Sequence, residues 1–349
     1  MLRPLHIASA LLAAACTASC MDFGPAPEEH FDSTGHGVFI VNEGNFNYGN
    51  ASLSYYDPAA QKVENGIFAR SNGIPLGDVA QSMTIHGRRG YITVNNSGVI
   101  FVIDLTTFRI VGSVDGLTSP RRICFYDEHR AYVTDLYDSR ITVFDPATLK
   151  ITGHIETGHA STEGIVACGR FLFVACWSYD DKIIVIDTDD DTVCDTISVG
   201  IQPSSLVSDR NGKIWVLTDG GYEGSPYGYT APALYRIDAA TRRLEKEFAF
   251  ALGDSATDLQ TDAEGQTLYF IRNNVWRMSV DADKLPDEPF IPTDGAVYYG
   301  LGIDPATSEI YLSDAADYMQ AGTVARYSPT GELLDVFRAG ITPNSFAFK

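Results

Sequence analysis

The chain of 349 residues carries 25 Lys and Arg residues against 45 Asp and Glu residues, so its formal net charge is −20 at pH 7. Such an acidic surface repels the phosphate backbone of nucleic acids and excludes nucleic-acid binding. It also repels anionic lipid headgroups, so any membrane contact requires a covalent anchor. Hydrophobic residues make up 45% and charged residues 20% of the chain, a balance that excludes a disordered protein.

The N-terminus has the pattern of an export signal. Residues 7–15 (IASALLAAA) form an apolar run that is too short to span a bilayer and has the length of a signal-peptide core. Small residues then lead into Cys16 and Cys20, and each context resembles a bacterial lipobox. We expect residues 1–19 to be removed and Cys20 to be lipidated, because Cys20 leaves a short spacer after the apolar run. Cys16 is the alternative.

The residues that follow predict a tether and one folded domain. Residues 21–36 contain Pro, Gly, Ser and acidic residues without apolar periodicity, which is typical of a flexible linker. No later hydrophobic stretch approaches membrane length. The predicted organisation is therefore a signal peptide (1–19), a tether beginning at the lipidated Cys20 (20–36) and a domain (37–349) whose only membrane contact is the lipid.

An internal repeat predicts the fold of this domain. An apolar strand that ends in a polar anchor residue and precedes a turn recurs every 41 to 51 residues, which is the period of four-stranded propeller blades. Helical periodicity is nowhere sustained for ten residues. The sequence therefore predicts an all-β fold, a seven-bladed β-propeller with four strands in each blade. The seven anchor residues are Asp57, Asp104, Asp145, Asp187, Asp238, Asp281 and Ser328.

The two ends of the domain predict how the ring closes. The first repeat begins directly with its second strand, HGVFIVNEGN, and lacks an inner strand before it. The chain ends with TPNSFAFK, which matches the inner-strand pattern of SPRRICF and QPSSLVS. We expect residues 344–348 to complete the N-terminal blade, because this pairing removes the open sheet edges.

One face of the propeller is expected to bind a ligand. The loops that join the second and third strands of the blades share one face, and they interleave aromatic side chains with amides, whereas the hairpins of the opposite face are plainly polar. Such a surface suits a large, mostly uncharged ligand with apolar faces and amide or hydroxyl edges, although any single ring could instead wedge between blades. The candidate loop residues are Phe46, Tyr48, Asn95, Asn96, Tyr137, Trp177, Tyr179, Tyr222, Tyr227, Tyr229, Asn273 and Tyr318.

Two arginines open the inner strand of the third repeat, close to the predicted axis. Arg121 and Arg122 could donate hydrogen bonds to the ligand or neutralise the nearby Asp78 and Asp135, and the sequence favours neither role. Arg122 is counted among the candidate ligand-binding residues.

Catalytic, metal and cofactor sites are not expected. Only one histidine, His159, falls on the ligand face, whereas nucleophilic catalysis and metal binding need several converging groups. The acidic turn 189–191 lacks the spacing of an EF-hand calcium loop. The cysteines of the domain lie in apolar, strand-like stretches without the paired spacing of a metal site, which indicates buried free thiols. They are Cys124, Cys168, Cys176 and Cys194.

The runs VNEGNF, SLSYYDP, PLGDVAQSM, YITVNNSG, TSPRRI, VGIQPSSL and IWVLTDGGYEG resemble those of YncE-like seven-bladed surface lipoproteins of didermic gut bacteria, over about residues 37–349. Among these, the BtuG-type proteins capture cobalamin across one propeller face and pass it to a TonB-dependent outer-membrane transporter. The resemblance implies a non-catalytic, surface-exposed outer-membrane lipoprotein that captures cobalamin (vitamin B12) or another corrinoid for such a transporter. The alternatives are a lactonase-like propeller hydrolase or lyase, and an adhesive surface protein that binds glycan or protein.

Overall fold

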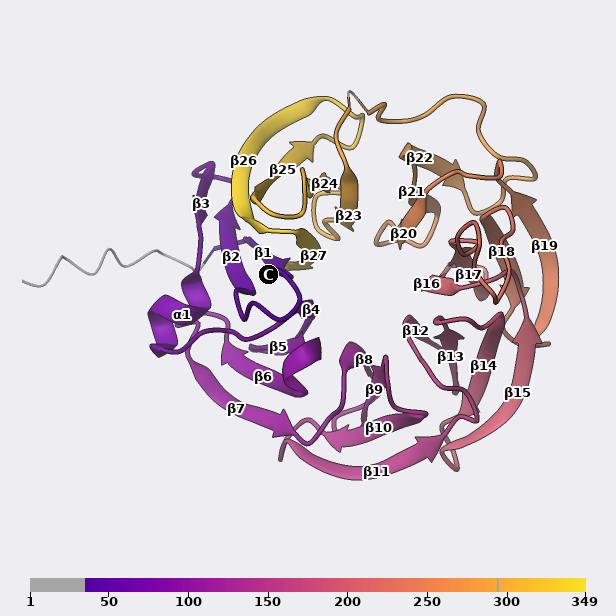
Figure 1. Cartoon of the computed structure of the whole chain (residues 1–349), viewed down its shortest axis with the longest axis horizontal. Coiled ribbons are helices and arrows are strands. Elements are labelled where there is room, and N and C mark those ends of the chain that lie inside the picture. The colour runs from indigo at the N-terminus through magenta and orange to yellow at the C-terminus, as the bar shows by residue number, and fades with distance from the viewer. Residues whose placement is uncertain (1–34, 294) are drawn as a thin grey trace, which may run out of the picture. The chain divides into compact units, whose positions relative to one another are not determined.

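The computed structural model describes residues 35–293 and 295–349, which leaves the predicted signal peptide, Cys16, the lipidation at Cys20 and all but the end of the tether outside the described residues. These residues form seven antiparallel sheets around a central axis (Figure 1). The prediction of an all-β, seven-bladed β-propeller is confirmed. Helical structure in this part of the chain amounts to α1 (Ile67–Asn72) and one 3-10 turn (Asn95–Ser97), and no helix in it is long and apolar enough to cross a membrane.

The strands of each blade follow one another from the axis outward. Blade one consists of β27 (Pro343–Phe348), β1 (Val38–Asn42), β2 (Ser52–Asp57) and β3 (Lys62–Glu64). Blade two consists of β4 (Ala80–His86), β5 (Arg89–Val94), β6 (Val99–Asp104) and β7 (Ile110–Asp115). Blade three consists of β8 (Pro120–Phe125), β9 (Ala131–Asp135), β10 (Arg140–Asp145) and β11 (Lys150–Glu156).

The second half of the ring repeats this order. Blade four consists of β12 (Ile165–Cys168), β13 (Phe171–Cys176), β14 (Lys182–Asp187) and β15 (Thr192–Ser198). Blade five consists of β16 (Pro203–Ser208), β17 (Lys213–Thr218), β18 (Ala233–Asp238) and β19 (Arg243–Ala249). Blade six consists of β20 (Ala256–Thr261), β21 (Thr267–Arg272) and β22 (Asn274–Ser279). Blade seven consists of β23 (Tyr298–Ile303), β24 (Ile310–Asp314), β25 (Ala321–Tyr327) and β26 (Leu333–Ile341).

The hydrophobic core lies between neighbouring blades. The second and third strands are sandwiched on both sides, so they read as continuous apolar runs such as KIIVID in β14, whose four central residues are fully buried. Between blades four and five, for example, Phe173 and Val185 pack in one cluster with Ile214 and Val216. The outer strand β15 instead alternates exposed and partly buried residues because one of its faces meets solvent.

The C-terminal strand closes the ring as predicted. β27 pairs antiparallel with β1, with Val38 opposite Phe348 and Phe39 opposite Ala347, and it contacts the inner strands β23 and β4 on either side. Just before the predicted start of the domain, the His36 ring forms 2.6 Å hydrogen bonds with a carboxylate oxygen of Asp304 and with the carbonyl oxygen of Lys349. The last residues of the expected tether are therefore part of the folded propeller.

Blade six departs from the predicted four strands. The segment 280–297 that should supply its outer strand carries Pro286, Pro289 and Pro292. Proline lacks the backbone N–H that a sheet ladder requires, so a strand cannot extend through such a segment. Among the described residues, its β-pairing with β22 is limited to an isolated bridge between Val275 and Ile291.

Candidate functional site

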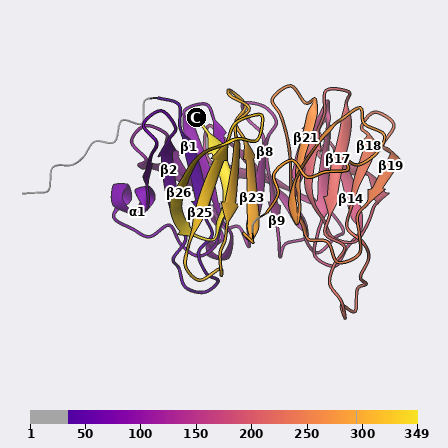
Figure 2. The ribbon, with the colours of Figure 1, turned by 90° about the horizontal axis from the view of Figure 1, so that it is seen from above.

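The loops between second and third strands emerge on one face of the disc, which is seen edge-on in Figure 2. We call this surface the loop face. The opposite face carries the hairpins between first and second strands and both ends of the described chain, where the Lys349 N–H donates to the carbonyl of Gly37. The loop face is formed by residues 43–51, 95–98, 136–139, 177–181, 219–232, 273 and 315–320.

Exposed aromatic rings are confined to the loop face. Within residues 35–293 and 295–349, every exposed Phe, Tyr or Trp side chain lies in one of these loops, with exposed fractions from 36% at Tyr229 to 71% at Tyr48. An aromatic ring that stays exposed to water adds no burial energy to the stability of the fold. Eight such rings on one side of the propeller therefore indicate a contact surface. They are Phe46, Tyr48, Tyr137, Tyr179, Tyr222, Tyr227, Tyr229 and Tyr318.

Blades four and five supply three of the predicted rings, of which two are in contact. The rings of Tyr179 and Tyr227 stack, with centroids 4.2 Å apart and planes 26° from parallel. Trp177 is half-buried, and its indole Nε1 donates a 3.0 Å hydrogen bond to Oδ2 of Asp219. Burial raises the pKa of Asp219, and this hydrogen bond opposes that shift. The stacked pair is therefore presented to solvent, whereas Trp177 holds two loops in place.

The three predicted asparagines hold loops rather than present free amides. Asn95 is buried, and its Oδ1 accepts a 3.0 Å hydrogen bond from the Ser119 hydroxyl. Asn96 Nδ2 donates to Asp78 at 2.7 Å, and the same carboxylate accepts the N–H of Asn47, so it joins the loops of blades one and two. Asn273 adopts the left-handed region (φ 55°), which asparagine tolerates, and its side chain bonds to Asp254 and Ser255 in the segment before β20.

A network of polar side chains lies where the inner strands begin, and we call it the axial cluster. Arg121 donates to Glu163 through Nε and to Oε1 of Gln81 at 2.6 Å through Nη1. Asn344 Nδ2 donates a 2.7 Å hydrogen bond to Glu43, and the Tyr299 hydroxyl donates to the same carboxylate at 3.1 Å. The axial cluster consists of Glu43, Gln81, Arg121, Glu163, Tyr299 and Asn344.

The axial cluster continues into the aromatic loops. The Arg121 guanidinium lies 5.9 Å from the Trp177 ring centroid, and the Tyr299 ring packs edge-on against Tyr318 with centroids 5.6 Å apart. Of the six members, the sequence singled out only Arg121. For four of the others the signal was the recurring start of the inner strands, VAQSM, SPRRI, STEGI, VYYGL and TPNSF, which places a polar residue at the same position each time. Glu43 instead directly follows β1 and lies outside this pattern.

Two acidic side chains near the propeller axis have pKa values that are raised by burial. Burial raises the pKa of Glu43 to about 7, and Arg121 and the Tyr299 hydrogen bond only partly oppose this shift. Burial also raises the pKa of Asp258, with Arg122 opposing. At neutral pH the Glu43 side chain is therefore present in two forms: a protonated carboxyl, which can donate a hydrogen bond, and a carboxylate, which only accepts them.

Arg122 is the axial cation with spare hydrogen-bonding capacity. Its nearest carboxylate oxygen, on Glu163, is 3.9 Å from Nε, and its guanidinium donates no hydrogen bond to any residue that the structure describes. It lines a cavity of about 50 Å³ in the axial channel together with Asp258 and Asn344. The two acidic residues that the sequence suggested as partners of Arg122 are hydrogen-bonded to other groups. Asp135 accepts hydrogen bonds from backbone N–H groups of its neighbouring loop, and Asp78 accepts one from the Asn96 side chain.

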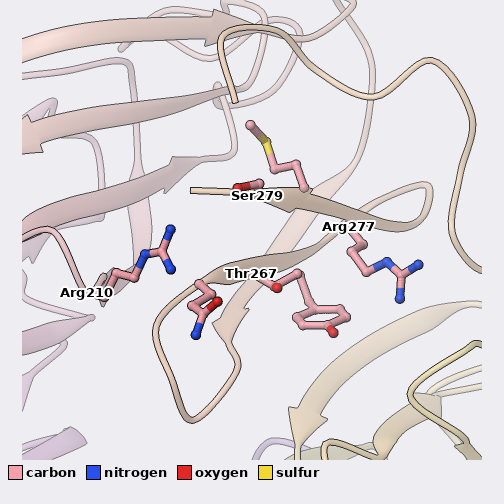
Figure 3. Close-up of a pocket in the computed structure, with 7 residues that line it drawn as sticks. Arg210, Thr267, Arg277 and Ser279 are labelled. Atoms are coloured by element: carbon pink, nitrogen blue, oxygen red, sulfur yellow. The ribbon is translucent and has the colours of Figure 1, made fainter. Parts of the chain in front are cut away.

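A larger cavity of about 370 Å³ lies at the opposite end of blade six, away from the aromatic loops. Figure 3 shows Arg210 from the first hairpin of blade five and Thr267, Arg277 and Ser279 from β21 and β22 lining it. Its lining is mostly polar and contains none of the predicted site residues.

The remaining prediction concerns the cysteines. Cys176 is buried and Cys124 and Cys168 are half-buried, but the predicted burial is wrong for Cys194, which is exposed on the alternating outer strand β15. All four thiols are free.

Comparison with known proteins gives a family and a fold. The family model described as a domain of unknown function, DUF5074, matches residues 36–337. No curated protein matches the chain. Similar solved structures include a quinonprotein alcohol dehydrogenase-like protein from Bacteroides thetaiotaomicron, with 14% identity and a TM-score of 0.71 over 91% of this chain and 79% of that one.

Two further structures cover 90% of this chain and 99% of their own at 13% identity. They are the periplasmic gluconolactonase of Pseudomonas aeruginosa, with a TM-score of 0.67, and a protein from Lactobacillus plantarum, with a TM-score of 0.68. At such identities the likeness shows the propeller fold alone. The DUF5074 model, in contrast, covers most of the sequence, and the chain belongs to that family.

Proposed function

We propose that the protein is a non-catalytic surface lipoprotein that captures a small-molecule nutrient on its loop face. The observation that carries this proposal is the confinement of exposed aromatic side chains to that face. Tyrosine and phenylalanine rings supply large contact areas at a low cost in conformational entropy, which suits a preformed binding surface.

Cobalamin or a related corrinoid is the ligand that we propose. A corrinoid is a broad ring system with apolar faces and a fringe of amides. The exposed rings match its faces, while amides need a donor and an acceptor side by side, as Arg122 and the carboxylates of Glu43 and Asp258 provide at the axis. The sequence resemblance to BtuG-type proteins supports the same ligand.

The position of the chain ends supports surface capture. The described chain begins on the face opposite the aromatic loops, where Gly37 accepts a hydrogen bond from Lys349. A lipid on Cys20 would be joined through residues 20–34 to the face that does not carry the aromatic loops. A TonB-dependent transporter would accept the released ligand.

Isothermal titration of the purified protein with cyanocobalamin tests the proposal. We expect saturable binding near one ligand per protein, weakened at least about tenfold in the Tyr179→Ala/Tyr227→Ala double variant because stacked aromatic anchors dominate such surfaces. The matched control is Leu333→Ala, which removes an exposed apolar side chain on β26 outside the loop face. Absence of binding, or equal loss in the control, would overturn the proposal.

A lactonase-like hydrolase is the second candidate, and one observation favours it. A carboxyl with a pKa of about 7, held beside Arg121 and Tyr299, has the properties of a general base. Acid release from glucono-δ-lactone would measure this activity. If the protein hydrolyses the lactone and Glu43→Gln abolishes the reaction, the proposed capture function gives way to an enzymatic one. If Glu43→Gln hydrolyses the lactone at an unchanged rate, Glu43 is not the general base.

A further inference from the structure

Three side chains that could bind a metal converge at the loop-face end of blade four. His159 lies between β11 and β12, Cys176 ends β13, and Asp180 lies in the loop to β14. The His159 Nδ1 and Asp180 Oδ2 atoms are 2.7 Å apart, and one ligand atom from each of the three residues lies within 4.8 Å of the others.

The local backbone fixes these positions. Tyr179 adopts a left-handed conformation (φ 62°), and the N–H of Asp180 donates to the carbonyl of Trp177, so the turn folds Asp180 back beside Cys176. The N–H of His159 donates a 3.0 Å hydrogen bond to the Thr157 hydroxyl, which holds the histidine segment from the other side. The three groups are therefore placed by two short, hydrogen-bonded turns.

We propose that His159, Cys176 and Asp180 bind a divalent transition-metal ion, with zinc as the best match. Imidazole nitrogen, thiolate sulfur and carboxylate oxygen are the three ligand types that zinc takes in proteins, and hard cations such as calcium disfavour sulfur. Zinc holds these ligands at about 2.0–2.3 Å, so the ligand atoms of a tetrahedral site lie about 3.3–3.6 Å apart. The His159 and Asp180 atoms therefore separate slightly from 2.7 Å on binding, and the sulfur, which lies within 4.8 Å of both, takes up the same spacing.

The partial exposure of the cluster fits such a site. The His159 and Asp180 side chains are 21% and 24% exposed, so an ion enters from solvent and reaches the thiol beneath them. On binding, the Cys176 thiol releases its proton to solvent and the sulfur–metal bond forms. Three protein ligands leave one coordination position open toward the loop face, where a ligand atom or water completes the shell.

A thiol nucleophile activated by the His–Asp pair is the competing interpretation. Reactive cysteines are partly exposed and have lowered pKa values. Cys176 has no exposed surface, and burial raises the pKa of its thiol far above the ordinary value. A substrate carbonyl cannot reach such a sulfur, whereas an ion bound by His159 and Asp180 would lie directly beside it.

The test is zinc titration of the purified, chelator-treated protein in competition with a chromophoric chelator. We expect one equivalent to bind, and Cys176→Ser, His159→Ala and Asp180→Asn each to lose about tenfold or more in affinity. Matched controls change the same residue types elsewhere: Cys168→Ser on β12 and the exposed His129→Ala should bind zinc like the unmodified protein.

A second measurement covers the case of a destabilised Cys176→Ser variant. Cobalt(II) should give a thiolate charge-transfer band in the unmodified protein and in Cys168→Ser, and zinc should raise the melting temperature of both. Asp180→Asn, which keeps the size of a partly exposed loop side chain, should reduce both signals without loss of fold. Lack of stoichiometric zinc binding, absence of the thiolate band, or binding unaffected by all three substitutions would overturn the proposal.

Discussion

The indole N–H of Trp177 and the carboxylate of Asp219 form a 3.0 Å hydrogen bond that joins the loops of two neighbouring blades. The other oxygen of Asp219 accepts the N–H of Gly221 at 2.8 Å, so the same carboxylate fixes the start of the long loop 219–232. Arg121 lies against the indole ring. Trp177 therefore connects the axial cluster to the aromatic loops and differs in role from the exposed tyrosines.

Replacing Trp177 by phenylalanine should destabilise the protein. Phenylalanine keeps an aromatic ring at this position but has no N–H, so the carboxylate of Asp219 loses a hydrogen-bond donor. A buried acceptor left without its donor lowers the free energy of unfolding by about 1–3 kcal/mol. Urea unfolding measures the change. Tyr227→Ala is the control and should stay within about 0.5 kcal/mol, because its side chain is exposed. Equal unfolding midpoints for Trp177→Phe and the unmodified protein would contradict this account.

Because of Glu43, the free energy of unfolding should fall as the pH rises. Its pKa is raised from 4.5 to about 7 by burial, so the folded state holds this proton more tightly than the unfolded chain does. The resulting stabilisation is complete below pH 4.5 and is lost as the pH rises through 7, up to about 3 kcal/mol for such a shift. Glu43→Gln, which cannot ionise, should therefore be more stable than the unmodified protein at pH 8 and similar to it at pH 5.

Glu64 provides a control of opposite sign. Hydrogen bonds from Arg70 and Lys62 lower the pKa of Glu64 despite partial burial, so its contribution is present at neutral pH and lost on acidification. Glu64→Gln should thus be less stable than the unmodified protein at pH 8. Melting temperatures at pH 5 and pH 8 decide the Glu43 case, and those at pH 3 and pH 8 decide the Glu64 case. A Glu43→Gln variant with the same pH dependence as the unmodified protein would refute the assignment.

The fold was predictable because each blade repeats the same local pattern. The strand-and-turn period identified seven units, and TPNSFAFK matched the missing inner strand that β27 supplies. The outer strand of blade six was not predicted correctly, since a repeat period does not register the three prolines that interrupt the ladder.

The site was predictable only in part. Loop aromatics could be assigned to one face because strand direction alone decides which end a loop occupies. The axial cluster joins residues such as Glu43 and Asn344, which come together only when the ring closes. His159 and Asp180 likewise meet through the folding of blade four, so a search for close sequence spacing did not reveal them.

Removing the last strand should unfold the whole domain. A chain that ends at Thr342 lacks β27, which pairs with β1 and packs against β4 and β23. The loss exposes sheet edges and core on both sides, and exceeds the roughly 5–15 kcal/mol by which domains are stable. Circular dichroism should show no cooperative thermal transition; a cooperative melt near that of the full chain would contradict ring closure as the source of stability.

Alanine substitutions at Gly300 and Gly153 compare a crowded glycine at the ring closure with a glycine that has open space around it. A Cβ on Gly300 of β23 would lie 1.8 Å from the carbonyl oxygen of Asn344 in β27, whereas a Cβ on Gly153 of β11 would meet nothing within 4 Å. Gly300→Ala forces the two inner strands apart and should cost about 3 kcal/mol or more. Gly153→Ala should be neutral or stabilise by up to about 1 kcal/mol through the unfolded state.

Denaturant midpoints of the two glycine variants measure this difference directly. Because Asn344 also donates to Glu43, the strain at Gly300 should reach the axial cluster and change the pH dependence of stability that Glu43 produces. Gly153 lies on an outer strand and should leave that pH dependence untouched. Equal midpoints in Gly300→Ala and Gly153→Ala would show that β23 and β27 do not approach as closely as the structure describes.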